Sequence, residues 1–392
     1  MSKKSQIISR QIYNLVTQTI KKKTKKFFLH EPYFDKNEKK YLNDCINSSF
    51  VSTAGKFISL FENSIKKVTK SKNIIAVLNG TVALKICLKI LGIKDGDEVL
   101  VPSFTFVGTV NAIVHAGGTP HFVDSDLNNF GVDMIKLDNY LKKISSIKRG
   151  VLINKKTKKK IFAIIPVHIF GNIGDMIKLK KICKKYKIKL IEDAAESLGS
   201  YYKKIHAGNF GDLGILSFNA NKVITTGSGG AIISNSKKIS NKIRHLISVA
   251  KKNHPWDFLH DDIGWNYKMN NLSAAVGYGQ MRKFSKIINL KKKLAEKYKK
   301  NCTNLKFISF CYAQNNCVSN NWLNIIKINK ITIADRNKIL NYLNNKGINC
   351  RPVWRLISSL KMYKKCQKDN LNNAKKLEKS ILCLPSGASY GE

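Results

Sequence analysis

Between about residues 70 and 235, short apolar runs alternate with longer amphipathic segments. IIAVL (74–78), EVLVPS (98–103) and IFAIIPVH (161–168) are almost continuously apolar, whereas VALKICLKIL and DMIKLKKICKKYK carry apolar residues at helical spacing. Strands without polar alternation are buried on both faces, as in parallel sheets that helices cover on both sides. The sequence therefore predicts an α/β fold built on a mainly parallel central sheet with helices on both faces.

The pattern changes on either side of this region. Residues 1–50 are polar and rich in lysine, with helical spacing in QIISRQIYNLVTQTIKKK and in NEKKYLNDCINS. After about residue 285, a long helical pattern leads into strand, helix and strand signals. We expect an N-terminal helical segment (1–50), a large domain (51–284) and a smaller C-terminal α+β domain (285–392).

Composition narrows the class of protein. A chain of 392 residues with 43% hydrophobic residues can bury a large core and is too apolar for disorder. It has no run of about 18 apolar residues and no signal-peptide core at its N-terminus, so we expect a cytoplasmic protein without a transmembrane helix. The nine cysteines form no CxxC pair, so we expect neither a metal site nor a disulfide framework.

The net charge of +45 comes from 70 Lys and Arg residues against 25 Asp and Glu residues. Such a charge is typical of proteins that bind nucleic acid or anionic membranes, but lysine enrichment of a solvated surface produces it too. Only seven of the basic residues are arginines, which supply bidentate contacts to nucleic acids, and the lysines are spread along the chain. We therefore expect no nucleic-acid or membrane partner, and we expect NKKTKKKI (154–161) to be a solvated connection.

Two motifs follow predicted strands near the start of the large domain. In NGTVALK, Gly80 and Thr81 lie where a strand gives way to a helix, and free amides at a helix N-terminus bind phosphate. An ordinary helix cap explains this motif equally well. In PSFTFVGT, Phe104 and Phe106 follow a buried strand, where an aromatic ring either stacks on a flat ligand or packs in the core.

Asp193 in LIEDAAES ends another apolar strand, between Glu192 and Glu196. A carboxylate buried there needs a partner, and a protonated pyridine nitrogen would serve. The alternative is a helix N-cap for the AAES segment that follows.

Lys222 lies in the glycine-rich stretch SFNANKVITTGSGG (217–230). A lysine that forms a Schiff base must be enclosed beside other polar groups, and Ser217 and Asn219 could bind a phosphate or a ring substituent nearby. A single lysine is ordinarily a surface charge. Here a phosphate-type turn, an aromatic ring, a strand-end aspartate, a serine and this lysine follow one another in order, and the combination favours a cofactor site.

These motifs resemble those of the DegT/StrS-type nucleotide-sugar aminotransferases. The resemblance runs from HEPYF (30–34) to LPSG (384–387), and it is carried by NGTVAL, GDEVLVPSFTFVGT, PVHIFGN, IEDAAESLGSYY, GDLGILSFNANKVITTGSGGAI and GWNYKMNNLSAA. It implies the fold-type I scaffold of aspartate aminotransferase, pyridoxal 5′-phosphate (PLP) as the cofactor, and a homodimer with shared active sites.

The resemblance also implies roles for individual residues. Lys222 falls at the lysine that bonds to the cofactor, Asp193 at the carboxylate on its pyridine nitrogen, and Phe106 at the side chain stacked on its ring. Because of the pyridinium charge, we expect the pKa of Asp193 to be depressed. Further cofactor-binding positions are Gly80, Thr81, Glu196, Ser217, Asn219 and Lys268.

At two of these positions, the role that the resemblance implies depends on which residue is present. Some relatives carry histidine at the position of Lys222 and dehydrate their substrate, so a lysine there favours transamination. Lys268 stands where the family usually has Arg or Asn reaching the phosphate of the neighbouring subunit, and lysine supplies a cation without the guanidinium fork.

Three stretches resemble the branch that serves legionaminic-acid-type sugar synthesis: HEPYF, KKNHPWDFLHDDIGWNYKMNN and RPVWRLISSLKMYKKC. This resemblance implies that L-glutamate aminates C4 of a 2-acetamido-2,6-dideoxy-4-hexulose linked to a nucleotide, usually UDP, for a surface glycan or a nonulosonic acid. One alternative is a GDP-perosamine-type aminotransferase. The other is a basic nucleic-acid- or membrane-binding protein on an inactive scaffold.

Overall fold

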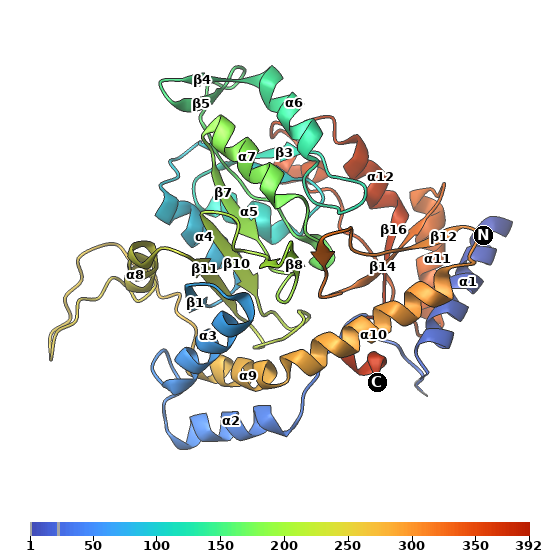
Figure 1. Cartoon of the computed structure of the whole chain (residues 1–392), viewed down its shortest axis with the longest axis horizontal. Coiled ribbons are helices and arrows are strands. Elements are labelled where there is room, and N and C mark those ends of the chain that lie inside the picture. Colours follow the sequence, from blue (N-terminus) through green and yellow to red (C-terminus); the bar gives the residue numbers. More distant parts are fainter. Residues whose placement is uncertain (1, 22–23) are drawn as a thin grey trace.

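A seven-stranded sheet forms the centre of the molecule (Figure 1). The computed structural model describes residues 2–21 and 24–392. From edge to edge the strands are β1 (Asn73–Val77), β11 (Gly230–Ser234), β10 (Leu213–Ser217), β7 (Lys189–Asp193), β6 (Ile161–Ile164), β2 (Glu98–Pro102) and β3 (Thr119–Val123). Only β11 is antiparallel to its neighbours in this sheet, so the prediction of a mainly parallel sheet is confirmed.

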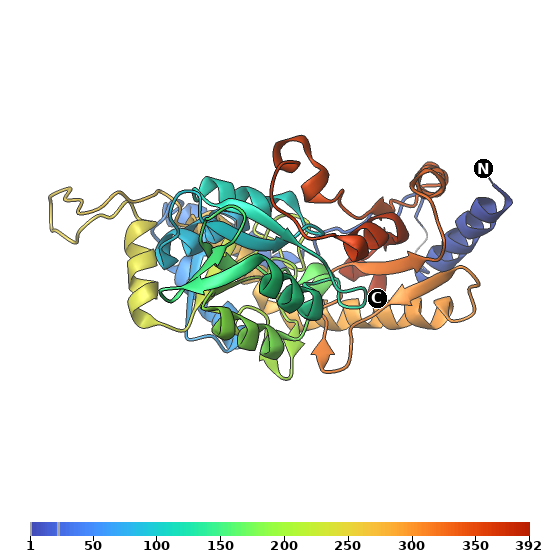
Figure 2. The same ribbon diagram turned by 90° about the horizontal axis from the view of Figure 1, so that it is seen from above.

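Helices cover both faces of this sheet (Figures 1 and 2). They are α3 (Lys56–Thr69), α4 (Gly80–Leu91), α5 (Val107–His115), α6 (Met134–Ile144), α7 (Met176–Tyr186), α8 (Lys237–Leu246) and α9 (Asn271–Arg282). Local sequence sets several of their ends: Asn79 caps α4 by accepting from the amide of Val82, and Asp175 caps α7 by accepting from Lys178. α4 packs on β10 and β11, so its N-terminus lies at the carboxyl edge of the sheet.

A second, smaller sheet lies beside the first. Its strands are β12 (Ile308–Cys311), β14 (Asn324–Ile328), β16 (Ile381–Leu384) and β15 (Arg351–Pro352), and its helices are α11 (Ile333–Asn345) and α12 (Asn372–Ser380). The long helix α10 (Phe284–Cys302) runs from α9 to this sheet (Figure 1). A second hydrophobic core forms here, separate from the core around the central sheet.

The two N-terminal helices pack on different parts of the molecule. α1 (Lys3–Thr19) lies against α10 and α11, and its Ile8 and Ile12 belong to the second core, whereas α2 (Lys36–Asn47) packs on α9. Residues 1 and 22–23 of the expected N-terminal segment lie outside the described residues. The domain boundaries at 50/51 and 284/285 stay predictions.

Short elements complete the chain. A hairpin of β4 (Ser145–Lys148) and β5 (Val151–Asn154) precedes the exposed lysine-rich connection at 155–160. A three-stranded sheet joins β13 (Cys317–Val318) to β8 (Tyr201–Tyr202) and β9 (Ile205–His206), and thereby links the two larger sheets. The 3-10 helices are η1 (Ile169–Gly171), η2 (Ile357–Ser359), η3 (Lys361–Tyr363) and η4 (Ala388–Gly391).

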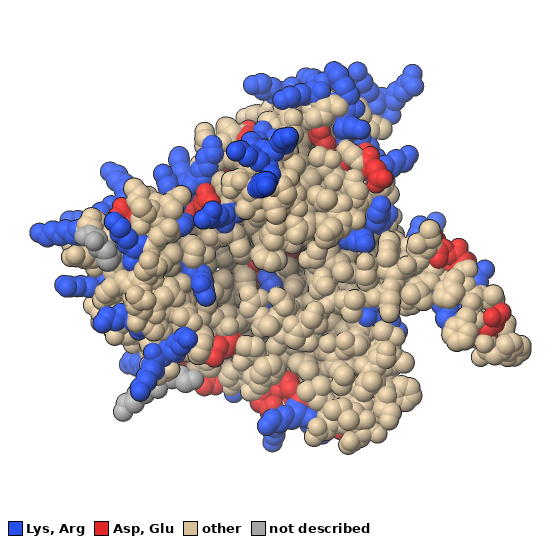
Figure 3. All heavy atoms as spheres, turned by 180° about the vertical axis from the view of Figure 1, so that it is seen from behind, with Lys and Arg blue, Asp and Glu red and all other residues tan. Residues whose placement is uncertain are grey.

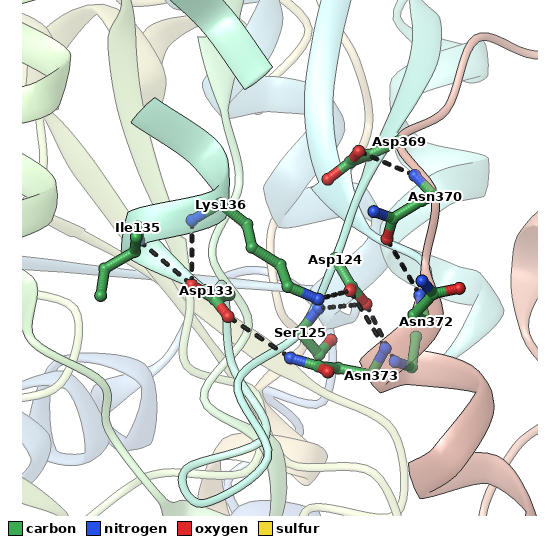
Figure 4. Close-up of polar contacts among 10 residues, drawn as sticks. Asp124, Ser125, Asp133, Ile135, Lys136, Asp369, Asn370, Asn372 and Asn373 are labelled. Atoms are coloured by element: carbon green, nitrogen blue, oxygen red, sulfur yellow. Dashed lines mark hydrogen bonds and ion pairs between the residues drawn. The ribbon is translucent and has the colours of Figure 1, made fainter. Parts of the chain in front are cut away.

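The segment before α12 returns across the central sheet. Phe122 of β3 pairs its backbone with residues 367 and 369, and the buried carboxylate of Asp124 accepts the amides of Asn373 and Ala374 at the start of α12 (Figure 4). Lys136 of α6 places its Nζ 2.6 Å from the same carboxylate. Burial raises the pKa of Asp124, but the hydrogen bonds from Lys136 and the two amides outweigh it, so this pKa lies below its ordinary value.

An arm between α8 and α9 projects from the body of the molecule (Figure 2). Backbone bridges pair residue 248 with 266 and residue 251 with 260. Three apolar side chains on the arm are almost fully exposed: Trp256 (81%), Phe258 (76%) and Ile263 (87%). Large apolar side chains that are this exposed are typical of interaction sites.

Charge is distributed unevenly over the surface. Figure 3 shows lysine and arginine side chains crowded around the periphery of one face and sparse in its middle. None of the described helices has the length and apolar character that crossing a bilayer requires. Among the described residues, no three His, Cys, Asp or Glu side chains are grouped so that they could hold a metal ion.

Candidate active site

The carboxyl edge of the central sheet brings together residues that are far apart in sequence. β7 ends at Asp193 and its neighbour β10 ends at Ser217, in a parallel pairing that sets Asp193 beside Ile215. β1 leads into Gly80 at the start of α4. Ligands of open α/β sheets bind outside this edge.

Asp193 is buried, with 4% of its surface exposed. Its Oδ2 accepts the hydroxyl of Thr109 at 2.7 Å, and its Oδ1 accepts the amide of Ala195 at 3.1 Å. Residues 194–200 form turns, so the alternative of a helix N-cap does not hold. No described Lys, Arg or His side chain lies within ion-pair distance of this carboxylate.

The pKa of Asp193 is raised, whereas the sequence led us to expect a depressed one. Burial is the main cause, and the hydrogen bonds from Thr109 and Ala195 oppose it only in part. The expectation assumed a pyridinium cation beside the carboxylate. Without such a cation the penalty of desolvation is the largest influence on this carboxylate, and a cationic ring nitrogen would relieve it.

Lys222 and Glu196 meet next to Asp193. The Nζ of Lys222 lies 3.4 Å from Oε1 of Glu196, and Oε2 of Glu196 accepts the amide of Phe170 at 2.8 Å. Burial raises the pKa of Glu196, the charge of Lys222 opposes this shift, and the charge of Asp193 adds to it. Lys222 is largely enclosed, with 13% of its side chain exposed.

Gly80, Thr81 and Ser217 form a narrow cradle at the start of α4. A Cβ atom on Gly80 would lie 3.2 Å from the Cβ of Ser217. A Cβ atom on Gly230, which pairs with Ser217, would lie 2.7 Å from the amide nitrogen of Gly80. Glycine at these positions therefore lets the helix terminus approach β10 closely, beside two side-chain hydroxyls, in the arrangement that phosphate sites use.

The two phenylalanines of PSFTFVGT have different environments. Phe104 is fully buried in the core, as its alternative interpretation predicts. Phe106 keeps 53% of its surface exposed at the N-terminus of α5, close to Thr81 and Gly108. An exposed ring there is free to stack on a flat ligand.

Asn219 and Lys268 lie at the margin of this cluster. Asn219 is exposed, and its carbonyl accepts the amide of Lys222 at 2.9 Å. Lys268 bridges Val77 through its backbone and lines a groove of about 420 Å³ at the base of the arm. Within the described chain, no hydrogen bond or ion pair connects Lys268 to Asp193, Glu196 or Lys222.

Sequence reasoning missed several residues that contact the cluster. Thr109 lies in the quoted motif PSFTFVGT, three positions after Phe106, so helical spacing could have placed it on the same side. Asn320 and Trp322 reach the cluster from the loop before β14. No local pattern marks that loop as part of the site.

The site fits PLP on four independent features. A buried carboxylate without a cation suits the pyridine nitrogen, an exposed phenyl ring suits the ring face, the cradle at α4 suits the phosphate, and an enclosed lysine suits the aldehyde carbon. These features meet at one edge of one sheet.

Comparison with known proteins agrees with this geometry. The sequence model of the DegT/DnrJ/EryC1/StrS aminotransferase family matches residues 32–392. The chain belongs to this family. It is therefore a PLP-dependent aminotransferase, and the family resemblance seen in the sequence is confirmed.

Several relatives of the chain have curated names. The chain is 38% identical over 338 residues to GDP-perosamine synthase of Vibrio cholerae, covering 86% of each chain. It is 31% identical to the putative pyridoxal phosphate-dependent aminotransferase EpsN of Bacillus subtilis (strain 168), covering 94% of this chain and 92% of the relative. It is 30% identical to UDP-4-amino-4,6-dideoxy-N-acetyl-beta-L-altrosamine transaminase of Campylobacter jejuni, covering 86% of each.

Solved structures show the same fold. PseC of Helicobacter pylori, an aminotransferase involved in the biosynthesis of pseudoaminic acid, superimposes with a TM-score of 0.84 at 24% identity, covering 93% of this chain and 94% of that one. The aminotransferase TlmJ of Streptoalloteichus hindustanus superimposes with a TM-score of 0.82 at 21% identity, covering 92% and 93%. The aminotransferase scaffold expected from the sequence is confirmed.

Proposed function

We propose that this aminotransferase uses L-glutamate to aminate the C4 keto group of a nucleotide-linked 6-deoxyhexose, giving a 4-amino sugar for a surface glycan or a nonulosonic acid. The observation that carries the proposal is the enclosed Lys222 amine, 3.4 Å from Glu196 and at the same sheet edge as Asp193. PLP, when bound, supplies an electron-withdrawing ring and carries the amino group between donor and acceptor.

Each residue of the site then has a defined task. Lys222 moves a proton between the substrate carbon and the reactive carbon of the cofactor, first as a base and then as an acid. Asp193 keeps the ring nitrogen protonated, and Thr109 orients that carboxylate through its hydroxyl. Glu196 holds the free Lys222 amine within the site. The cofactor-binding residues in this proposal are Gly80, Thr81, Phe106, Asp193, Glu196, Ser217, Asn219, Lys222 and Lys268.

Two substrates have support. Relatives named GDP-perosamine synthase are 38% and 35% identical to the chain, in Vibrio cholerae and Escherichia coli O157:H7, and favour a GDP-linked sugar. The UDP-altrosamine transaminase relative, at 30% identity, and the stretches HEPYF and RPVWRLISSLKMYKKC favour a UDP-linked 2-acetamido sugar of the legionaminic-acid type. Sequence identity gives the GDP-linked sugar at least equal weight, although the motifs first indicated UDP.

We further propose a homodimer in which a second copy covers the projecting arm. The arm exposes the apolar side chains of Trp256, Phe258 and Ile263, and Lys268 lines a groove at the base of the arm. Lys268 is the position that the family resemblance assigns to the neighbouring subunit's phosphate, and it lies apart from the cluster of its own chain. A cytoplasmic location and the lack of nucleic-acid and membrane partners stay predictions.

The test has two stages. Absorbance spectra with PLP, before and after L-glutamate, are compared for the wild type, Lys222→Ala and the control Lys237→Ala on α8. The proposal expects an absorption band of the lysine-bound cofactor that glutamate bleaches in the wild type and the control but that Lys222→Ala does not form normally. Product analysis with paired UDP- and GDP-linked 4-keto sugars then identifies the nucleotide. A wild type without this band, or with a band indifferent to glutamate, refutes transamination.

A further inference from the structure

The free amine of Lys222 lies against an aromatic face that no motif marked. Its Nζ is 4.1 Å from the ring centroid of Trp322, and Trp322 is 3% exposed. A cation over an indole face is stabilised by the ring quadrupole, most strongly where water is excluded. The amine is thus held between the indole face on one side and the carboxylate of Glu196 on the other.

Trp322 also holds the backbone next to Lys222. Its indole Nε1–H donates to the carbonyl of Asn221 at 2.6 Å, and Asn221 directly precedes the lysine. Lys222 itself is fixed in a turn by its amide bond to the carbonyl of Asn219. One side chain therefore contacts both ends of the lysine: the indole N–H meets the backbone beside it, and the indole face meets its amine.

The loop that carries Trp322 is fastened to the Glu196 turn as well. Asn320 donates through Nδ2 to the carbonyls of Glu196 at 2.8 Å and Leu198 at 3.0 Å, and its Oδ1 accepts the amide of Trp322 at 2.9 Å. This pair of residues comes from the loop before β14, outside the central sheet. It ties the turn after β7 to the turn after β10, so that Glu196 and Lys222 keep their spacing.

Trp322 is itself held rigidly. The carbonyl of Trp322 accepts the Nζ of Lys291 at 3.1 Å, and Lys291 is fully buried in α10. The indole ring stacks on Phe170 with an interplanar angle of 25°, and Phe170 stacks in turn on Trp354 at 12°. Phe170 adopts a positive φ of 58° and donates its amide to Glu196. Strained backbone that the surroundings hold in place is typical of functional sites.

We propose that Trp322 is a positioning residue for Lys222, which holds the lysine amine beside Glu196 whenever that amine is not bonded to the cofactor. The proposal rests on the proposed function for its catalytic meaning. If Lys222 is released from the cofactor during transamination, its amine must remain within reach of the reacting carbon to transfer a proton. The indole face and the indole N–H confine the released amine to that position.

The test uses the full-length protein freed of cofactor, so that it does not depend on turnover. Acylation of Lys222 by a small amine reagent is followed by mass spectrometry at about pH 7.5 and about pH 11 in the wild type, Trp322→Leu and Trp322→Phe. Trp354→Leu is the matched control, because Trp354 belongs to the same aromatic stack but its indole does not lie over the Lys222 amine. Thermal unfolding verifies that each variant is folded.

An indole face attracts the cationic form of an amine that lies over it, and the reagent attacks only the neutral form. We expect Trp322→Leu to raise the labelling rate at pH 7.5 by about threefold to tenfold and to leave it nearly unchanged at pH 11. Trp322→Phe keeps an aromatic face that attracts a cation more weakly, and it loses the indole N–H. Its labelling rate at about pH 7.5 is expected to lie between those of the wild type and Trp322→Leu. Trp354→Leu should match the wild type at both pH values.

Two results would overturn the proposal. An equal rise at both pH values would show that the indole only restricts access of the reagent, and a rise in Trp354→Leu as large as in Trp322→Leu would show a general loosening of the stack. If Trp322→Leu fails to fold, the contrast between Trp322→Phe and Trp354→Leu decides. Failure of transamination in the wild type would refute the proposed function but leave the labelling contrast in the cofactor-free protein intact.

Discussion

The substitution Asp193→Asn should stabilise the cofactor-free protein while weakening its affinity for PLP. Asn is nearly the same size as Asp, and its Oδ1 can still accept the amide of Ala195. Its Nδ2 would then face the Thr109 hydroxyl, which can accept that hydrogen and donate its own to Thr105, 3.2 Å away. The variant therefore removes the charge and leaves no buried polar atom without a partner.

The magnitude follows from the burial of Asp193. Its folded-state pKa is raised above the ordinary value of 3.8, so the folded protein binds the proton more tightly than the unfolded chain. The ionised form accordingly costs stability as the pH rises past 3.8, and the cost is complete above the folded-state pKa. We expect Asp193→Asn to add about 1 kcal/mol at neutral pH, which is a rise of about 2 °C in melting temperature. With the pyridinium partner lost, the Kd for PLP should rise about a hundredfold, or about 3 kcal/mol.

The assay is thermal unfolding of wild type and Asp193→Asn, with and without PLP, at pH 8 and near pH 3, taken as roughly one unit below the ordinary aspartate value. Wild type should gain melting temperature with PLP, and the variant should gain far less at the same PLP concentration. The stability advantage of the cofactor-free variant should disappear near pH 3, where both proteins are uncharged at this position. A variant that melts several degrees below wild type without PLP, or that binds PLP equally tightly, would refute the reasoning.

Three further substitutions test other parts of the structure. Asp124→Asn leaves Lys136 without its carboxylate and should lower the free energy of unfolding by about 2–3 kcal/mol in urea unfolding at pH 7. Because the pKa of Asp124 is lowered, this loss should shrink as the pH falls below 3.8. Thr109→Val removes the hydroxyl that donates to Asp193 and should weaken PLP binding about fivefold in a fluorescence titration. The double variant Trp256→Asp/Phe258→Asp should halve the mass measured by light scattering, because a charged arm cannot bury its surface against a second copy.

Each of these substitutions has a contrary outcome, and Asp124→Asn also has a matched control. Asp138→Asn breaks the ion pairs with the exposed Lys142 and Lys185, and its amide oxygen can still accept the Tyr186 hydroxyl, so it should change stability by less than about 1 kcal/mol. If it costs as much as Asp124→Asn, the buried cap of α12 is not the reason for the loss. If Thr109→Val leaves the affinity for PLP unchanged, Asp193 needs no orienting hydroxyl. An arm variant that keeps its mass would place the subunit contact elsewhere.

Much of the central domain follows from local sequence. Runs such as IIAVL and EVLVPS could become only buried strands, because they lack the polar alternation of a strand with a solvated face. The structure accordingly begins and ends β1 and β2 within about one residue of those runs. The order of the motifs around Asp193 and Lys222 also pointed to the site, since the carboxyl ends of parallel strands meet at one edge.

Other features depend on contacts that no local pattern encodes. α1 is a plain amphipathic helix in sequence, yet Ile8 and Ile12 contribute to the core around α10 and α11, which begin at residues 284 and 333. The pKa of Asp193 departs from the family-based expectation because it depends on the charges around the carboxylate. Lys268 bears a cation as expected, but its place at the base of the arm follows from its pairing with Val77.

The sequence by itself determined the α/β class and the family and gave an ordered set of candidate site residues, because buried strands, helix caps and glycine turns are encoded within a few neighbouring residues. Only the tertiary structure decided which residues enclose the Lys222 amine. Trp322 follows Lys222 by one hundred positions and carries no motif, and it reaches the lysine because packing of α10 and the β14 loop against the central sheet brings the two side chains within 4.1 Å. Contacts of this kind depend on how separate elements pack against one another, and no short stretch of the sequence encodes that packing.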